Sequence, residues 1–247
     1  MTQTFVDYSG APVERTRWRT LAVFAHTFSG SARVVARSTL GRLRPQHVDA
    51  VIERWCGHVF RLSKTTLTAD GLGRFPHGQP YLLLSNQTYL LDIPAVSTTF
   101  PGRVRFVAKA ELERVPMFGK AMKRAGIIFV DRSDRSQAIE ALRSASDLSR
   151  SGTSLWIAAE GGRSRDGSLG PLKKGPFHTA LLLGVPILPV WIEGTAQVIE
   201  AGSLYSNTGQ QVHVRYGAPI PTEGLGTADI PELLSRSRAA LEQLAAE

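Results

Sequence analysis

The amino-acid sequence predicts an α/β fold, in which a largely parallel sheet flanked by helices follows an N-terminal helical segment. Short apolar runs typical of buried strands alternate with stretches of helical periodicity, a pattern that favours parallel strands covered on both faces. The chain has 247 residues, of which 43% are hydrophobic, and this is enough to bury a full core. We therefore expect two parts, a helical segment over residues 1–64 and one α/β domain over residues 65–247.

The expected helices are the segments in which apolar residues recur every three or four positions. Two of them make up the N-terminal segment, at Thr16–Arg42 and His47–Leu62. The α/β domain adds one that begins at Asp92 and others at Val115–Arg124, 138–148, Pro176–Leu183 and Ile230–Leu244. We expect Asp92 to be an N-cap with Pro94 in the first turn, a combination that favours the start of a helix.

The expected strands are apolar or alternating runs bounded by turn residues. They lie at Thr65–Thr68, Tyr81–Ser85, Arg103–Lys109, Gly126–Val130, Leu155–Ala159, Val185–Ile192 and Val212–Tyr216. The second of these runs is almost wholly apolar, which is typical of a strand buried on both faces.

Positive charge narrows the class of partner. A formal net charge of +8 and a pI near 10.1 imply an anionic partner, which could be a nucleic acid, a lipid headgroup or a phosphorylated substrate. Residues 1–64 hold ten Lys and Arg against four acidic residues, and residues 101–135 hold nine against four. The sequence has no helix-turn-helix, RNP motif or zinc-ligand spacing, so we expect no nucleic-acid partner.

The N-terminal segment has the composition of a membrane-surface helix. Its longest uncharged run, Thr20–Ala32, is shorter than the roughly 18 apolar residues that a membrane span needs. Aromatic residues such as Trp18 and Phe28 stand beside arginines, as in helices that bind anionic membrane surfaces. We expect peripheral binding at the cytoplasmic face of a membrane. The alternative is an ordinary amphipathic helix packed on its own domain.

Cysteine chemistry is not expected. The single Cys56 excludes an intramolecular disulfide and offers no framework for a metal, which suits a reducing compartment. We expect neither a metal nor a cofactor.

Three polar clusters follow predicted strands. They are Asn86, Gln87 and Asp92 in SNQTYLLDIP (85–94), Asp131 and Arg132 after GIIFV, and the segment EGGRSRDGSLGPLKKG (160–175). Because loops that leave the carboxyl ends of parallel strands line one crevice, these clusters should converge. Glycines beside arginines suit a phosphate group. The alternatives are a solvated surface loop for the third cluster and a surface ion pair for the second.

Four blocks in this order resemble the glycerolipid acyltransferases, the group that contains 1-acylglycerol-3-phosphate acyltransferase. SNQTYLLDIP aligns without gaps to a block of the form Asn-His-x-x-x-x-Asp. AKAELERVPMFGKAMKRAGIIFVDR resembles the second block, EGGRS (160–164) the Glu-Gly-Thr-Arg-Ser block, and VPILPV (185–190) the last. The likeness covers about residues 65–220 and implies a glycerolipid acyltransferase-like fold.

The resemblance implies acyl transfer in phospholipid synthesis. The acyl group would move from the thioester of acyl-CoA or acyl carrier protein, as co-substrate, to a lysophospholipid or glycerol phosphate acceptor. In this scheme residue 87 takes the proton of the acceptor hydroxyl, and Asp92 orients residue 87. The implied substrate-binding residues are Asn86, Arg132, Glu160, Gly161, Gly162, Arg163 and Ser164.

Two positions depart from the family pattern. Gln87 stands where the family has its histidine, and Gly162 replaces a residue with a hydroxyl group. An amide can donate and accept hydrogen bonds but cannot hold an abstracted proton, and losing a general base costs about 10²- to 10⁴-fold in rate. Three explanations remain open: an introduced substitution or sequence error, a natural relative that binds lipid or CoA without turnover, or an enzyme that takes its base from elsewhere.

Four histidines are candidates for such a base. His178 lies nearest to the motifs, although its position is more typical of a packing role, and His58, His77 and His213 are more typical of surface or core residues. Asp92 also has a purely structural interpretation as a helix cap.

Overall fold

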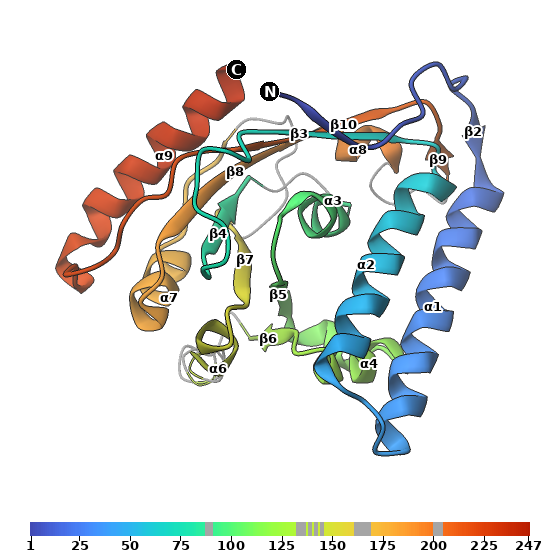
Figure 1. Cartoon of the computed structure of the whole chain (residues 1–247), viewed down its shortest axis with the longest axis horizontal. Coiled ribbons are helices and arrows are strands. Elements are labelled where there is room, and N and C mark those ends of the chain that lie inside the picture. The colour runs from blue at the N-terminus through green and yellow to red at the C-terminus, as the bar shows by residue number, and fades with distance from the viewer. Residues whose placement is uncertain are drawn as a thin grey trace.

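The computed structural model describes residues 1–86, 91–131, 137, 140, 143, 146–160, 169–199 and 205–247 (Figure 1). The N-terminal part holds β1 (Gln3–Val6), β2 (Arg15–Thr16), α1 (Arg17–Thr39) and α2 (Pro45–Leu62). Next come β3 (Thr66–Asp70), β4 (Leu82–Ser85), α3 (Asp92–Thr99), β5 (Val104–Lys109), the 3₁₀ helix η1 (Ala110–Arg114), α4 (Phe118–Arg124) and β6 (Ile128–Val130). The remainder is α6 (Ser146–Arg150), β7 (Ser154–Ala158), α7 (Gly175–Leu183), β8 (Ile187–Glu193), α8 (Thr195–Val198), β9 (Ser206–Asn207), β10 (Gln211–Tyr216), η2 (Thr227–Asp229) and α9 (Ile230–Ala246).

The main sheet of the described residues has eight strands in the order β1-β3-β10-β8-β4-β7-β5-β6. Strands β8, β4, β7, β5 and β6 are mutually parallel, whereas β10 runs antiparallel to β8 and β1 runs antiparallel to β3. The predicted α/β class with a largely parallel sheet is therefore confirmed. A parallel block also means that the carboxyl ends of these five strands lie at one edge of the sheet, which we call the carboxyl edge.

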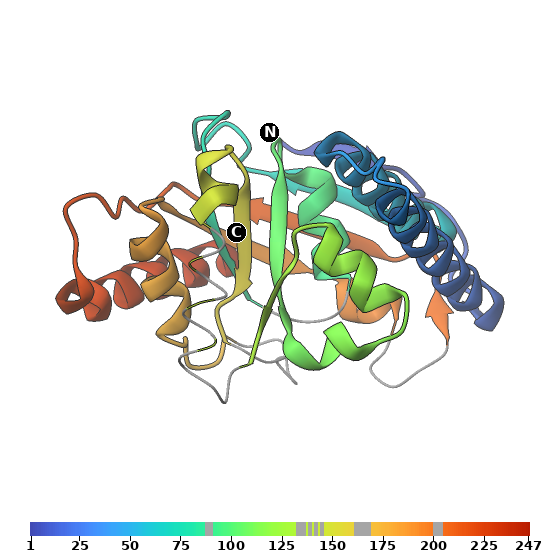
Figure 2. The same ribbon diagram turned by 90° about the horizontal axis from the view of Figure 1, so that it is seen from below.

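Helices cover the two faces of the parallel block (Figures 1 and 2). On one face, residues of α2 and α3 such as Phe60 and Val96 join the core with the apolar side chains of β3 and β10. On the other face, α7 and α9 contribute Phe177 and Leu241 to a second core. This burial on both faces explains why Leu82–Leu84 reads as a continuous apolar run, since all three side chains are 0% exposed.

The N-terminal helices pack as an antiparallel pair beside the sheet (Figure 1). Helix α4 lies against α1, and a third apolar cluster that includes Val48, Ala108 and Met122 joins α2, β5 and α4. Strand β1 of the same N-terminal segment pairs with β3 in the main sheet. Among the helices of the described residues, none is long and apolar enough to cross a bilayer.

Most predicted elements are present with shifted ends, and one capping prediction is wrong. Pro94 lies in the first turn of α3 as expected, but the N-cap is Leu91, whose side chain makes no capping hydrogen bond, and Asp92 is the first helical residue. The helix predicted at Val115–Arg124 begins only at Phe118, because Met117 has a φ of 63° that interrupts the helical backbone.

Candidate active site

Polar residues follow four of the five parallel strands at the carboxyl edge. They are Asn86 and Asp92 after β4, Asp131 after β6, Glu160 after β7 and Thr195 after β8. The predicted site residues Gln87, Arg132, Gly161, Gly162, Arg163 and Ser164 lie outside the described residues. Of the predicted set, the described part of the chain therefore brings Asn86, Asp92 and Glu160 to the same edge.

Asn86 directly follows β4, and its side-chain amide is hydrogen-bonded to the backbone of β8. Its Nδ2 donates to the carbonyl oxygen of Ile192 at 2.8 Å, and its Oδ1 accepts from the Ile192 amide at 2.8 Å. The side chain is only 2% exposed. These contacts fix the end of β4 against β8. Contact with substrate stays a prediction for this residue.

Asp92 is a buried carboxylate held by a residue that the sequence analysis missed. Its exposed fraction is 0%, and its Oδ1 accepts a hydrogen bond of 2.5 Å from the Oγ1 of Thr195, which is also 0% exposed. Thr195 follows Gly194, whose φ is +89° and where a Cβ would lie 2.0 Å from the Gln211 carbonyl oxygen. Only glycine fits there, so Gly194 marks a tight turn directly after β8, but the local sequence gives no sign that Thr195 contacts Asp92.

Glu160, at the start of the glycine-rich segment, is hydrogen-bonded to Gly170 later in the same segment. Its Oε2 accepts from the Gly170 amide at 2.9 Å, and Gly170 in turn offers its carbonyl oxygen to Nη2 of Arg238 at 2.6 Å. Lys173 donates its backbone amide to the carbonyl of Ala159 at 2.8 Å, so the returning chain lies beside the end of β7. The residues on both sides of 161–168 are thus bonded to each other. Contact between Glu160 and an acceptor phosphate stays a prediction.

Lys109 is a cation at the carboxyl edge that the sequence analysis did not single out. It is the last residue of β5, pairs in register with Val130 of β6, and is exposed. Strand β5 lies between β7 and β6, so Lys109 lies between the ends of the strands that precede Glu160 and Asp131. The signal was its place at the end of an alternating strand. A lone lysine at such a place is too common to predict a site.

The candidate alternative bases have other described surroundings. His58 stacks on His26 with ring centroids 4.6 Å apart, between α1 and α2. His213 lies between Thr68 Oγ1, at 2.6 Å from its Nδ1, and the Asp70 carboxylate, at 3.0 Å from its Nε2. The other two are exposed: His77 and His178.

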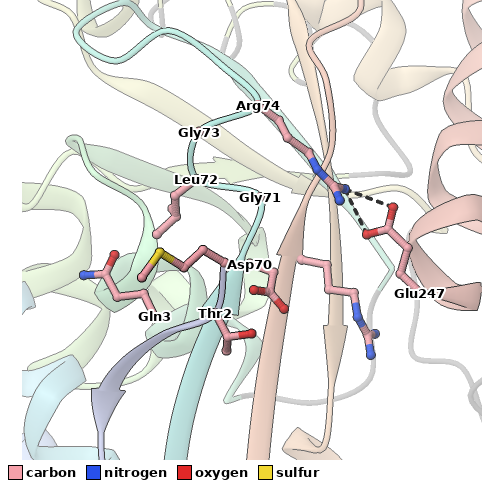
Figure 3. A pocket seen from close by; sticks show the side chains of 10 residues that line it. Thr2, Gln3, Asp70, Gly71, Leu72, Gly73, Arg74 and Glu247 are labelled. Carbon is pink, nitrogen blue, oxygen red and sulfur yellow. Dashed lines mark hydrogen bonds and ion pairs between the residues drawn. The ribbon is translucent and has the colours of Figure 1, made fainter.

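A cavity of about 870 Å³ lies elsewhere (Figure 3). It is lined by Asp70, by the loop up to Arg74, and by residues near both chain ends, and Arg74 forms an ion pair with Glu247 at 2.9 Å there. Strand β3 runs antiparallel to the parallel block, so its last residue, Asp70, lies at the edge of the sheet opposite to the carboxyl edge. This cavity is therefore separate from the candidate site. Within the described part of the chain, no three His, Cys, Asp or Glu side chains gather to hold a metal ion.

Comparison with known proteins shows the family of the chain. A family profile described as Acyltransferase matches residues 66–193. The human 1-acyl-sn-glycerol-3-phosphate acyltransferase alpha is 35% identical over 182 residues, which is 73% of this chain and 64% of that protein. The Saccharomyces cerevisiae 1-acyl-sn-glycerol-3-phosphate acyltransferase is 34% identical over 163 residues, 65% of this chain and 54% of that protein. The chain thus spans less than two thirds of the length of these relatives.

A solved structure has the same architecture. The crystal structure of the 1-acyl-sn-glycerophosphate (LPA) acyltransferase PlsC from Thermotoga maritima superposes with a TM-score of 0.69 at 25% sequence identity. The likeness covers 94% of this chain and 99% of that chain, so it includes the N-terminal helices as well as the sheet. Since the family profile matches more than half of the residues and the human relative is 35% identical over 73% of them, the chain belongs to the acyltransferase family.

Proposed function

We propose that this protein is an O-acyltransferase of phospholipid synthesis that moves a fatty acyl group from acyl-CoA or acyl carrier protein to a lysophosphatidate-like acceptor. Family membership and the names of the relatives support the reaction class. The observation that carries the proposal is the buried carboxylate of Asp92, held by Thr195 at the carboxyl edge five positions after residue 87. Burying a carboxylate costs free energy unless the carboxylate is hydrogen-bonded. A hydrogen-bonded buried carboxylate at this edge is therefore a candidate for orienting a neighbouring group.

The chemistry requires one proton acceptor. The acceptor's hydroxyl oxygen attacks the thioester carbonyl carbon, the carbon–sulfur bond breaks, and the hydroxyl proton passes through a base to the leaving thiolate. With glutamine at position 87, the amide oxygen can accept a hydrogen bond from the hydroxyl and so position it, but it cannot take the proton. Asp92 would then orient Gln87 rather than stabilise a charged base. We expect slow turnover as a result.

The acceptor phosphate would be bound by cations at the carboxyl edge. Arg163 and Arg132 are the proposed bidentate partners, and Lys109 adds a point charge between β6 and β7. Arg163→Ala should weaken binding of a phosphorylated acceptor by about tenfold or more, since a hydrogen bond to a charged group contributes roughly 1.5–3 kcal/mol. Lys173→Ala is the matched control, because we assign Lys173 only a general attraction for anions. Equal affinities of the two variants would remove Arg163 from the phosphate site.

The decisive experiment restores the base. Gln87→His, assayed with acyl-CoA and lysophosphatidic acid, should gain at least about tenfold in rate, in line with the 10²- to 10⁴-fold contribution of a general base. Gln87→Asn serves as control and should gain nothing. Adding Asp92→Asn to the histidine variant should abolish the gain, because the new base then loses its orienting carboxylate. A histidine variant no faster than the parent would show that the site does not use this base.

One other function has a specific observation in its favour. Because Gln87 is not titratable, the chain would equally serve as a relative that binds lipid or CoA without turnover. Such a protein would bind both ligands with ordinary affinity and release no thiol from acyl-CoA over long incubation, whereas the enzyme would release it slowly. Thiol detection with and without acceptor separates the two.

Helix α1 is the proposed membrane contact, at the cytoplasmic face. Trp18, Leu21, Phe24 and Phe28 are 55–60% exposed, and their spacing of three to four residues places them along one face. Exposed apolar side chains in such a row suit the interfacial region of a bilayer, with flanking arginines at the anionic headgroups. A Phe24→Ser/Phe28→Ser variant should bind less than the parent chain to vesicles with 30% anionic lipid. If the two bind equally well, α1 does not have this role.

A further inference from the structure

The chain just before α1 is paired with the chain that follows α8. Strands β2 and β9 run antiparallel and form a small sheet of their own beside the start of α1 (Figure 1). Directly after β9, the buried Thr208 accepts from the Glu14 amide through its hydroxyl at 2.9 Å and donates its own amide to the Glu14 carbonyl at 3.0 Å. We call this paired unit, residues 12–16 with 206–209, the clamp.

The clamp is tightly held at both of its ends. At Gly209, whose φ is +68°, a Cβ would lie 2.5 Å from the Ala11 carbonyl oxygen, so the two segments approach as closely as backbones can. At the other end, the guanidinium carbons of Arg15 and Arg17 lie 4.3 and 4.5 Å from the centroid of the Tyr205 ring. Cation–π contacts at these distances are attractive. Both sets of contacts fix β9 to the chain that leads into α1.

One side chain of the clamp reaches α8. The Nδ2 of Asn207 donates to the carbonyl oxygen of Gln197 at 2.8 Å. The last carbonyls of a helix have no partner within that helix, so this bond satisfies a group that the four residues of α8 cannot satisfy themselves. An isolated bridge between Ile199 and Ser206 also pairs the chain that leaves α8 with β9. The end of α8 is therefore held against the clamp.

The beginning of α8 carries the contact to the buried carboxylate. Thr195 is the first residue of α8, and its hydroxyl donates to Asp92 at 2.5 Å. Gln197 lies two residues later, which is about 3 Å along a helix. A helix of one turn is too short to be stable without tertiary contacts, so the contacts at its two ends decide where it lies. A displacement at Gln197 would therefore also displace the hydroxyl of Thr195.

Resting on the proposed function, we infer that Asn207 is a positioning residue, which holds α8 in the place from which Thr195 fixes the Asp92 carboxylate. Catalytic groups must be held within about 0.5 Å of their productive geometry by the groups around them. Asn207 itself is held by β2, which directly precedes α1. The N-terminal segment thereby takes part in building the active site, in addition to its proposed contact with a membrane.

The first experiment requires no turnover. Hydrogen exchange of the backbone amides of residues 194–198 is measured by NMR in the full chain, with Gln87 unchanged, and in Asn207→Ala. We expect exchange about threefold faster or more in the variant, because a hydrogen bond that restrains α8 is lost. Gln197→Ala is the matched control, since it removes an exposed side chain of α8 and keeps the carbonyl that accepts the bond. Equal exchange rates in the two variants would overturn the inference.

The second experiment connects the position of α8 with the reaction. In the Gln87→His background, where the introduced base depends on Asp92, Asn207→Ala should lower kcat about threefold or more and leave both KM values within about twofold. In Gln87→His/Asp92→Asn the same substitution should lower the residual rate no further, because Asn207 acts through Asp92. A bond that only stabilised the fold would lower kcat equally in both backgrounds, and this result would also overturn the inference.

An isosteric variant separates the hydrogen bond from the shape of the side chain. Asn207→Asp keeps the shape and removes the donor, so it should behave as Asn207→Ala does in both experiments. If it behaves as the parent chain does, the bond to Gln197 is not what holds α8, and the inference fails. If Gln87→His transfers no acyl group although exchange at 194–198 depends on Asn207, the proposed reaction is rejected and the link from Asn207 to Thr195 stands.

Discussion

Thr195→Val tests the contact that holds the buried carboxylate of Asp92. Valine keeps the shape of threonine but replaces the hydroxyl that donates at 2.5 Å with a methyl group. Asp92 is 0% exposed, so water cannot supply the missing donor. A hydrogen bond to a charged group contributes roughly 1.5–3 kcal/mol, and we therefore expect a loss of about 2 kcal/mol in the free energy of unfolding.

The assay is equilibrium unfolding in urea, with calorimetry in parallel. For a chain of this length, 2 kcal/mol corresponds to a fall in Tm of about 4–8 °C. Thr195→Ser is the control, because serine keeps the hydroxyl and loses one methyl group, at a cost of about 0.8 kcal/mol. The hydroxyl variant should therefore be the more stable of the two, although it has lost more apolar surface.

A double-mutant cycle with Asp92→Asn isolates the pair. If the contact between Thr195 and Asp92 matters, the two substitutions together should cost less than the sum of their separate costs, by more than the roughly 0.3–0.5 kcal/mol typical of independent sites. Additive effects, or a valine variant more stable than the serine variant, would refute the reasoning.

Two further predictions concern stability. Asn86→Ala leaves the buried amide and carbonyl of Ile192 without partners and should cost roughly 2–4 kcal/mol, against less than about 1 kcal/mol for Asn207→Ala, whose single bond is exposed; similar urea midpoints for the two variants would contradict this. Burial lowers the pKa of His26 below its ordinary value of 6.5, and neighbouring His58 lowers the pKa further. The unfolded chain then binds the proton first, so the free energy of unfolding should fall as pH drops below about 6.5. Unfolding curves between pH 8 and 5 check this, and His26→Gln should have a flatter pH dependence than the parent chain.

Sequence periodicity was sufficient for the central sheet and the long helices, because the residues that form them are buried in regular patterns. Leu82–Leu84 and the alternation in Arg103–Lys109 predicted two of the parallel strands. Strands β2 and β9 were missed, since each has two residues and no period can be read from so few. The order of strands, with β10 antiparallel beside β8, was not predictable, because it depends on contacts between distant residues.

The same limit applies to the candidate site. Asp92 was found through its spacing from residue 87, but its role as an N-cap was inferred from local preference alone. Its described partner, Thr195, is 103 residues away in sequence, and no local pattern predicts a contact over that separation. Asn86 was likewise found by motif, whereas its paired bonds to Ile192 depend on the neighbouring strand. Motifs thus located the residues, and tertiary contacts determined what each side chain touches.

The pairing of β1 with β3 has a practical consequence for shortened versions of this protein. Residues Gln3 to Val6 cover one side of β3, on which Leu67 and Ala69 are 0% exposed. A chain trimmed to the matched family region, beginning at Thr66, would leave that strand with a row of bare amide and carbonyl groups. Such an uncovered border is a template for joining two molecules side by side, so trimming would promote self-association rather than yield a minimal monomer.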